Sequence, residues 1–182
     1  MTRLFSILLL ICLSPIFAII ALAIIMDDGF PILFCQRRIG INNNKFWIYK
    51  FRTMKKDTPN IPTHLVNESQ NINTFIGPIL RKSSIDELPQ LINILKGEMG
   101  FIGPRPALYN QDDLKNLRTE RGIHKLKPGL TGWAQINGRD DLSIPEKVEL
   151  DKYYLKNKSF GLNIKILFMT VAKVLSLKGV SH

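Results

Sequence analysis

The sequence has little cysteine and histidine, which argues against several kinds of site. It contains two cysteines and three histidines in 182 residues. No CxxC pair and no His-x-x-x-His spacing occurs, so a zinc site is not expected. A disulfide framework is not expected either, because Cys12 lies inside an apolar run and Cys35 just beyond it. This cysteine usage fits a reducing compartment such as the cytosol.

Glycine loops that bind nucleotide phosphates are also missing. The sequence has neither a GxxxxGK[ST] loop nor a GxGxxG fingerprint, and the glycines at 97, 100 and 103 match neither spacing. Serine and histidine residues show no local nucleophile signature, and no internal repeat occurs. The chain is therefore not expected to bind a nucleotide through either of these two motifs.

Charged side chains are absent from Leu4 to Met26. A helix of this length rises about 1.5 Å per residue and reaches across about 30 Å of hydrocarbon. Ser14-Pro15 lies in its middle, where Pro15 removes a backbone donor, so a bend is expected. The segment predicts a protein that works at a membrane.

Three interpretations of this segment compete. A straight transmembrane helix is one. A secretory signal peptide cleaved near Ala21-Leu22-Ala23 is the second, although the apolar run continues beyond that point and only Arg3 precedes it. A broken, re-entrant helix is the third, and it alone leaves the basic residues on both flanks at the cytoplasmic face. The residues themselves leave the span and the hairpin open.

The net charge of +10 points to an anionic partner. Phospholipid headgroups, nucleic acid and phosphorylated substrates all fit, and the membrane segment favours the first and third. Nucleic acid is not expected as a partner. Residues 1–28 form the membrane segment, and residues 29–182 are enough for one domain with its own core.

Hydrophobic periodicity predicts a small hairpin followed by helices. Residues 31–36 and 45–54 predict two strands, joined by a turn rich in glycine and asparagine. In the second strand, Lys50 and Arg52 lie on the face opposite Trp47, Tyr49 and Phe51.

The rest of the chain predicts helices, turns and loops. The C-terminal helix carries interspersed lysines, so it either lies in the headgroup region or faces the core. Helices are expected at 85–95, 112–125, 144–156 and 164–177, a loop or loose helix at 57–74, a rigid connector at 97–106 and a turn with a following extended piece at 128–133.

The strongest candidate site is the run from Arg81 to Pro89. Two cations precede the adjacent carboxylates Asp86 and Glu87. The simpler alternative is a capping box between Ser84 and Glu87. Pro89 would then be the fifth helical residue, where its missing N–H costs a bond. A helix that starts nearer Asp86 avoids this cost and puts both carboxylates at the positive end of the helix dipole.

Carboxylates beside Mg²⁺ and several cations are what phosphoryl transfer requires. The candidate cations are Lys50, Arg52, Arg81 and Arg105. Arg105 stands between two prolines, so its backbone is stiff and it loses less entropy on gripping a phosphate. Taken alone, each of these side chains also fits a solvated surface charge.

Four ordered motifs carry a family resemblance. They are KFRTM at 50–54, RKSSIDELPQL at 81–91, GPRP at 103–106 and KPGLTGW at 127–133. With the hydrophobic segment, they make the chain resemble the bacterial sugar transferase family, the monotopic polyprenyl-phosphate phosphoglycosyl transferases. Its length resembles the small members that act on UDP-bacillosamine-type sugars.

The resemblance implies an α+β, mostly helical fold. Its parts would be a re-entrant membrane helix broken at Ser14-Pro15, a small β-hairpin and a helical catalytic domain with interfacial amphipathic helices. It also implies monotopic attachment to the bacterial inner membrane, with the catalytic domain on the cytoplasmic face.

The resemblance further implies roles for the site residues. Asp86 would attack a UDP-sugar and expel UMP, and polyprenyl (undecaprenyl) phosphate would then take the sugar phosphate. Asp86 and Glu87 would hold Mg²⁺, while Lys50, Arg81 and Arg105 would bind phosphates. Two alternatives remain, a non-catalytic membrane-surface scaffold and a membrane-anchored UDP-sugar hydrolase. The sugar and the oligomeric state are not predicted.

Overall fold

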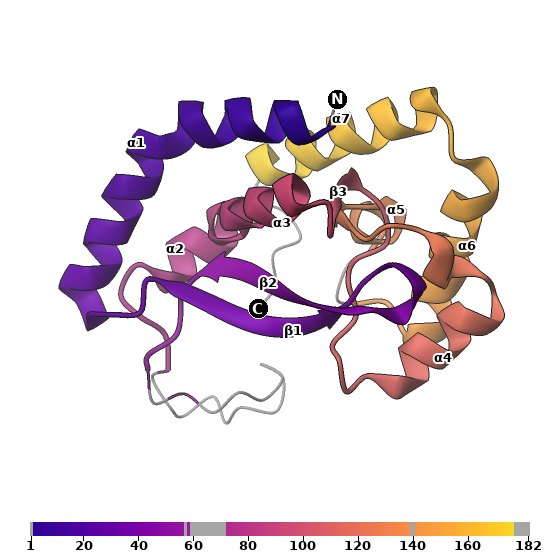
Figure 1. Cartoon of the computed structure of the whole chain (residues 1–182), viewed down its shortest axis with the longest axis horizontal. Helices are drawn as coiled ribbons and strands as arrows, with labels where there is room; N and C mark the ends of the chain where they lie inside the picture. The colour runs from indigo at the N-terminus through magenta and orange to yellow at the C-terminus, as the bar shows by residue number, and fades with distance from the viewer. Residues whose placement is uncertain (1, 57, 59–71, 139–140, 177–182) are drawn as a thin grey trace.

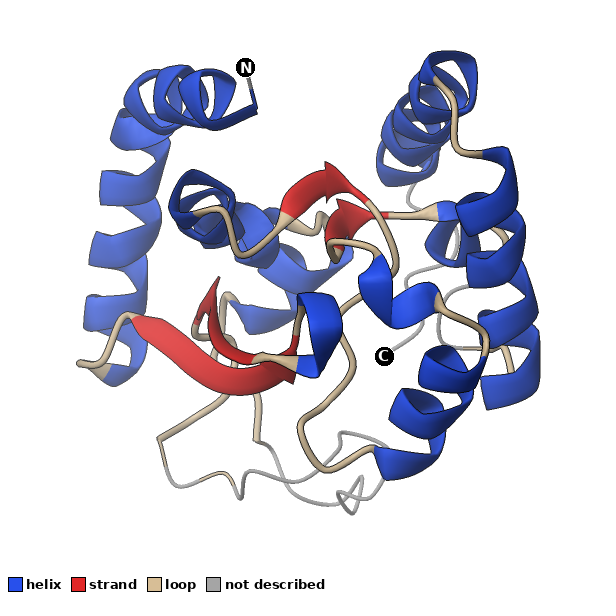
Figure 2. Cartoon of the chain, turned by 45° about the vertical axis from the view of Figure 1, so that its right-hand side comes forward, coloured by secondary structure: helices blue, strands red, loops and turns tan. Residues whose placement is uncertain are grey.

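The computed structural model describes residues 2–56, 58, 72–138 and 141–176, in which helices pack around two small sheets, one of them at the lower edge in Figure 1 (see also Figure 2). The fold is mostly helical, as predicted. The α-helices are α1 (Thr2–Asp28), α2 (Gly77–Lys82), α3 (Leu91–Lys96), α4 (Asp112–Glu120), α5 (Trp133–Ile136), α6 (Ile144–Asn157) and α7 (Phe160–Ser176). The strands are β1 (Leu33–Ile39), β2 (Lys45–Phe51), β3 (Gly100–Ile102) and β4 (Gly129–Thr131), and the 3₁₀ helices are η1 (Ile41–Asn43), η3 (Ile85–Gln90) and η4 (Ile123–Lys125).

Helix α1 is continuous and bent near its middle (Figure 1). Pro15 lacks the N–H that would bond the Ile11 carbonyl, and the Ser14 hydroxyl donates to that carbonyl instead, at 2.8 Å. The Ser-Pro pair therefore supplies both the bend and the replacement hydrogen bond. The expected bend is present, but the expected break is not.

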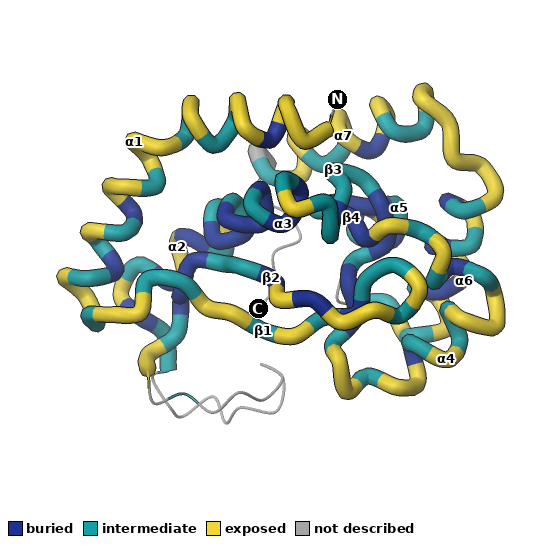
Figure 3. The backbone as a smooth tube through the Cα atoms, viewed as in Figure 1, coloured by how far each residue is buried: buried dark blue, intermediate teal, exposed yellow. Residues whose placement is uncertain are grey.

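One side of α1 packs on the domain and the rest is exposed (Figure 3). Ile20 and Ile24 contact Phe51 and Leu80, and leucines earlier in the helix contact β2 and α3. Within the described residues, α1 is also the one helix long and apolar enough to cross a membrane. Its exposed apolar face is consistent with membrane association.

Arg52 fixes the end of α1 to the domain. Its guanidinium donates to the backbone carbonyls of Asp28 at 3.1 Å and Gly29 at 2.6 Å, and to the Asp28 carboxylate at 2.5 Å. These bonds satisfy carbonyls that the end of a helix leaves without partners. Arg52 is therefore an anchor, and its assignment as a phosphate-binding candidate is wrong.

Strands β1 and β2 form the predicted antiparallel hairpin, with Cys35 opposite Tyr49 and Arg37 opposite Trp47. The turn passes through asparagines with positive φ, a conformation that asparagine tolerates. The expected aromatic face is only partly right. Trp47 is exposed, whereas Phe51 is buried.

Asn93 supports the free edge of β2 where a third strand would pair. Its amide nitrogen donates to the Trp47 carbonyl at 2.6 Å and to Glu98 at 2.7 Å, and its amide oxygen accepts the Tyr49 N–H at 3.2 Å. The side chain has no exposed surface. Asn93 thereby fixes the position of α3, which follows η3, against β2.

Replacing Asn93 by alanine is expected to lower the free energy of unfolding by about 2–4 kcal/mol, because a fully buried side chain is lost and the three polar groups that it bonds lose their partner. Asn157→Ala, an exposed asparagine at the end of α6, is the control and should change it by less than about 0.5 kcal/mol. Urea unfolding of the detergent-solubilised protein measures both. Equal small changes would mean that Asn93 does not support this edge.

The stretch predicted as a rigid connector at 97–106 contains a strand. Strand β3 pairs in parallel with β4, with Gly100 opposite Gly129 and Ile102 opposite Thr131. A Cβ on Gly103, Gly129 or Gly132 would come within 2.1–2.3 Å of backbone atoms of the facing segment. These glycines allow two backbones to touch, and they join the GPRP and KPGLTG motifs.

The remaining elements follow the predicted positions with shifted bounds. The helix at 144–156 is confirmed as α6, and a capping box between Ser143 and Glu146 starts it. The predicted helix at 112–125 divides into α4 and η4, and the one at 85–95 into η3 and α3. An extended piece was expected after the turn at 128–133. The extended residues are instead those of β4, which lies within 128–133. Most of the predicted loop at 57–74 lies outside the described residues.

Candidate active site

The two candidate carboxylates lie on the short 3₁₀ helix η3. Ser84 precedes it with φ 57°, and its side chain makes no capping hydrogen bond. The capping-box alternative is therefore wrong, and the carboxylate of Glu87 is used elsewhere. Both Asp86 and Glu87 are buried, which is unusual for carboxylates unless cations surround them.

Glu87 lies between two cations from distant parts of the chain. Its Oε1 is 2.8 Å from Nζ of Lys50 on β2 and 2.8 Å from Nη2 of Arg105. A second, longer bond joins Arg105 Nη1 to Oε2 at 3.4 Å. The Lys50 ammonium is also 3.9 Å from Oδ2 of Asp86. Three of the four family-like motifs thus meet at this dyad.

Asp86 is the less occupied carboxylate. Within the described part of the chain, it accepts no hydrogen bond, and Lys50 is its one ion-pair partner. Its oxygens are therefore available to react with, or bind, a group that enters the site. Glu87 has its oxygens committed to Lys50 and Arg105.

The surroundings shift the pKa values of the two carboxyl groups in opposite directions. Burial raises the pKa of Asp86; the neighbouring cations oppose this rise and the Glu87 charge adds to it. Burial also disfavours the charge on Glu87, but Arg105 and Lys50 outweigh it and hold the pKa of Glu87 well below its usual value. Burial lowers the pKa of Lys50, and the Glu87 charge opposes this. Glu87 is thus a fixed anion beside a more basic carboxylate.

Arg81 lies close to the dyad but does not contact it directly. Its Nε donates to the Thr53 hydroxyl at 2.8 Å, which links α2 to the segment after β2. Its charge lowers the pKa of Asp86. The structure therefore brings Lys50, Arg81 and Arg105 together around the carboxylates, with Arg81 in the outer position.

The loop that carries Arg105 is held by four consecutive carbonyls, the last of which, that of Ala107, accepts from the Ile39 N–H at 2.9 Å. The Pro104 carbonyl accepts from the Gly129 N–H at 3.0 Å, that of Arg105 from Arg118 at 2.8 Å, and that of Pro106 from Arg38 at 3.2 Å. No local sequence pattern points to Arg118 or Arg38. Arg118 is 13 residues from Arg105 and Arg38 is 68 residues from Pro106, and only the fold brings them to this loop.

The donor set fits a magnesium ion only together with a substrate. No group of three or more candidate metal ligands occurs among the described residues. Among the residues that the structure describes here, three cations lie around two carboxylates, which gives an excess of one positive charge before a substrate binds. Mg²⁺ accepts one or two carboxylates when phosphate oxygens and water complete its shell. Asp86, with uncommitted oxygens, fits this role better than Glu87.

Comparison with known proteins shows the family to which the chain belongs. The chain matches the family described as bacterial sugar transferase over residues 1–177. It is 43% identical to an uncharacterized sugar transferase, EpsL, of Bacillus subtilis (strain 168), over 95% of this chain and 85% of that protein. The chain belongs to the bacterial sugar transferase family.

Two longer relatives have more specific names. The chain is 39% identical to the UDP-glucose:undecaprenyl-phosphate glucose-1-phosphate transferase of Escherichia coli (strain K12), over 91% of this chain and 37% of that protein. It is 41% identical to the undecaprenyl-phosphate glucose phosphotransferase of Komagataeibacter xylinus, over 92% of this chain and 34% of that protein. The chain thus spans about a third of the length of these two relatives.

Proposed function

We propose that this protein is a phosphoglycosyl transferase, which moves a sugar 1-phosphate from a UDP-sugar to polyprenyl (undecaprenyl) phosphate and releases UMP. The observation that carries the proposal is the buried Asp86–Glu87 pair, with Lys50 and Arg105 fixed on Glu87 and the oxygens of Asp86 left uncommitted. The relatives' named activities support the substrate classes. A scaffold would have no use for such a dyad. The reaction would begin a polysaccharide or another glycoconjugate.

In the first step, an Asp86 oxygen attacks the phosphorus that carries the sugar. The bond from this phosphorus to the bridging oxygen breaks, and UMP leaves with the electron pair. The product is a phosphosugar esterified to Asp86, an acyl phosphate. Burial raises the pKa of Asp86, and a more basic carboxylate is a better nucleophile.

In the second step, an oxygen of polyprenyl phosphate attacks the same phosphorus. The bond to Asp86 breaks, the carboxylate is regenerated, and the lipid diphosphate-linked sugar leaves. A covalent intermediate lets one pocket serve a soluble donor and a lipid acceptor in turn, which is a ping-pong mechanism.

The neighbouring residues stabilise charge. Glu87 holds Lys50 and Arg105 in fixed positions, and these cations neutralise phosphate oxygens as negative charge builds on them. Arg81 adds to the positive field from its outer position. When bound, Mg²⁺ would be held by Asp86, assisted by Glu87, and would polarise the diphosphate of the donor.

The apolar helices support attachment to a membrane. The first half of α1 and helix α7 lie at the same edge of the molecule, the upper one in Figures 1 and 2. Both helices expose large apolar side chains, among them Leu4 and Leu8 on α1, and Phe160 and Phe168 on α7. The bend at Pro15 would let α1 enter and leave the inner membrane on the cytoplasmic face, with α7 lying in the headgroup region.

UMP release tests the function directly. With a panel of UDP-sugars, Mg²⁺ and polyprenyl phosphate in detergent, at least one donor should give UMP in amounts that follow the acceptor. EDTA should reduce turnover to background, and added Mg²⁺ should restore it. Multiple turnovers of UMP without acceptor would identify a hydrolase instead. Release of no UMP from any donor would contradict the proposal.

Labelling of residue 2 tests the topology. In a protein with Cys12 and Cys35 replaced by serine, Thr2→Cys should react with a membrane-impermeant maleimide only after the cells are opened. The bent helix would return the N-terminus to the cytoplasmic side. Labelling in intact spheroplasts would show that α1 spans the membrane instead. The same assay with Pro15→Ala, which restores a straight helix, should increase that labelling.

A further inference from the structure

A buried ion pair lies behind the loop that carries Arg105. Arg118 on α4 donates from Nε and Nη2 to Oδ2 of Asp151 on α6, at 3.0 and 2.6 Å. Asp151 is 1% exposed. Burial raises its pKa and Arg118 opposes this rise. The Arg118 guanidinium is therefore fixed in place by a carboxylate that has almost no access to water.

The remaining guanidinium nitrogen of Arg118, Nη1, bonds to the loop that carries Arg105. It donates to the backbone carbonyl of Arg105 at 2.8 Å. The side chain of Arg105 in turn contacts both oxygens of Glu87. A continuous series of contacts thus leads from Asp151 through Arg118 and Arg105 to Glu87, and it joins α6 to η3.

We propose that Arg118, oriented by Asp151, is a positioning residue that fixes the Arg105 backbone so that its guanidinium meets Glu87. The inference rests on the proposed transferase function and deepens it. Arg118 contacts the carbonyl of the residue whose side chain is used, whereas the bonds from Gly129, Arg38 and Ile39 reach the residues on either side of it. Loss of the Arg118 bond removes the hydrogen bond to the Arg105 carbonyl while those to the neighbouring carbonyls remain.

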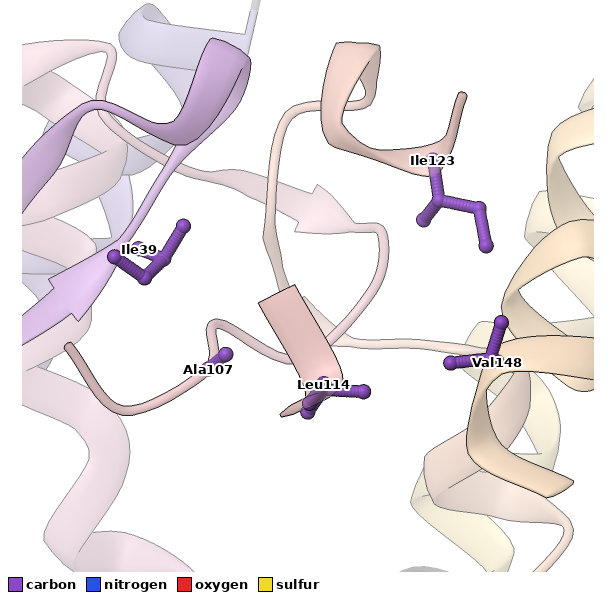
Figure 4. Packing of buried hydrophobic residues seen from close by; sticks show 5 residues of the cluster. All are labelled: Ile39, Ala107, Leu114, Ile123 and Val148. Atoms are coloured by element: carbon purple, nitrogen blue, oxygen red, sulfur yellow. The ribbon is translucent and has the colours of Figure 1, made fainter. Parts of the chain in front are cut away.

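A purely structural role would be largely redundant at this place. Helices α4 and α6 already share an apolar cluster that includes Leu114, Ile123 and Val148, and Leu114 and Val148 face each other in Figure 4. Buried ion pairs often contribute little net stability compared with apolar packing. The pair is better explained by the geometry that it imposes on Arg105.

A double-mutant cycle separates the two roles. Arg118→Lys keeps a charge next to Asp151 but removes the fork that binds Asp151 and the Arg105 carbonyl together. We expect it to lower kcat for UMP release roughly tenfold or more, because small displacements at a site are costly to the rate. In an Arg105→Lys background, the same substitution should cost less than about twofold, since the side chain that it positions is already altered.

Two further variants keep the test independent of folding. Asp151→Asn should lower kcat by part of the amount that Arg118→Lys does. The kcat loss caused by Asp151→Asn should also be smaller in the Arg105→Lys background. Val148→Ala, one turn away on α6, is the control for loosened packing and should lower Tm while kcat stays within about twofold of wild type.

The outcomes are distinct. Coupling between Arg118 and Arg105, with kcat retained in Val148→Ala, supports positioning. If the wild type is active and the kcat losses of Arg118→Lys and Arg105→Lys are additive, the positioning role is contradicted and the proposed transferase function is not affected. A kcat loss in Val148→Ala as large as that in Arg118→Lys contradicts the positioning role also, because packing alone would then explain both. A wild-type protein that releases no UMP contradicts the proposed function itself.

Discussion

Replacing Asp86 by asparagine is expected to lower UMP release by about a thousandfold or more, because the side chain loses the oxygen anion that attacks phosphorus. The change is close in shape, and the Asp86 carboxylate accepts no hydrogen bond from the described residues that asparagine would lose. UMP release with and without polyprenyl phosphate measures the effect. The matched control is Glu120→Gln, an exposed acid on α4, which should keep wild-type turnover.

The same substitution should not destabilise the protein. Burial raises the folded-state pKa of Asp86, so the ionised form costs folding free energy at neutral pH and the protonated form does not. Asparagine resembles the protonated form, so the Tm at neutral pH should stay the same or rise. A lower Tm together with lost activity would mean that Asp86 serves the fold. Near wild-type turnover would exclude it as the nucleophile.

Replacing Arg105 by alanine should lower turnover by about a hundredfold, which corresponds to about 3 kcal/mol of transition-state stabilisation. The substitution removes a cation from the phosphates and also leaves the buried Glu87 with Lys50 as its one remaining ion-pair partner among the described residues. Lys82→Ala is the control, because Lys82 is an exposed cation that adjoins Arg81 in the sequence. It should stay within about twofold of wild type.

Arg105→Lys distinguishes charge from geometry at this position. Lysine keeps one positive charge but cannot make the two-pronged contact with Glu87. We expect it to recover only part of the activity that alanine loses. Equal small effects of Arg105→Ala and Lys82→Ala on turnover would show that Arg105 is an ordinary surface charge.

The part of the site that the sequence could predict is the part encoded locally. Asp86 and Glu87 are adjacent, and the alternation of β2 is enough to predict Lys50 on the face opposite Trp47 and Tyr49. Arg105 was suggested by the two prolines beside it. Local chemistry also predicted the bend at Pro15.

The parts that it could not predict depend on contacts between distant segments. Strands β3 and β4 have three residues each, too short for a periodic pattern, and they pair because glycines let their backbones approach. Arg118 and Asp151 are 33 residues apart on different helices. Arg52 resembled a phosphate ligand because its motif does not reveal that the end of α1 folds back onto it.

The account depends on a transient bond between the Asp86 carboxylate and a sugar phosphate. Enzyme incubated without acceptor, with a UDP-sugar that wild type uses and that is labelled with ³²P in the β-phosphate, should retain label through rapid quenching. The label should map to the peptide containing Asp86. Hydroxylamine should release it, because hydroxylamine cleaves acyl phosphates, and addition of polyprenyl phosphate should move it to lipid. Formation of labelled lipid product with no label ever found on that peptide would contradict the account.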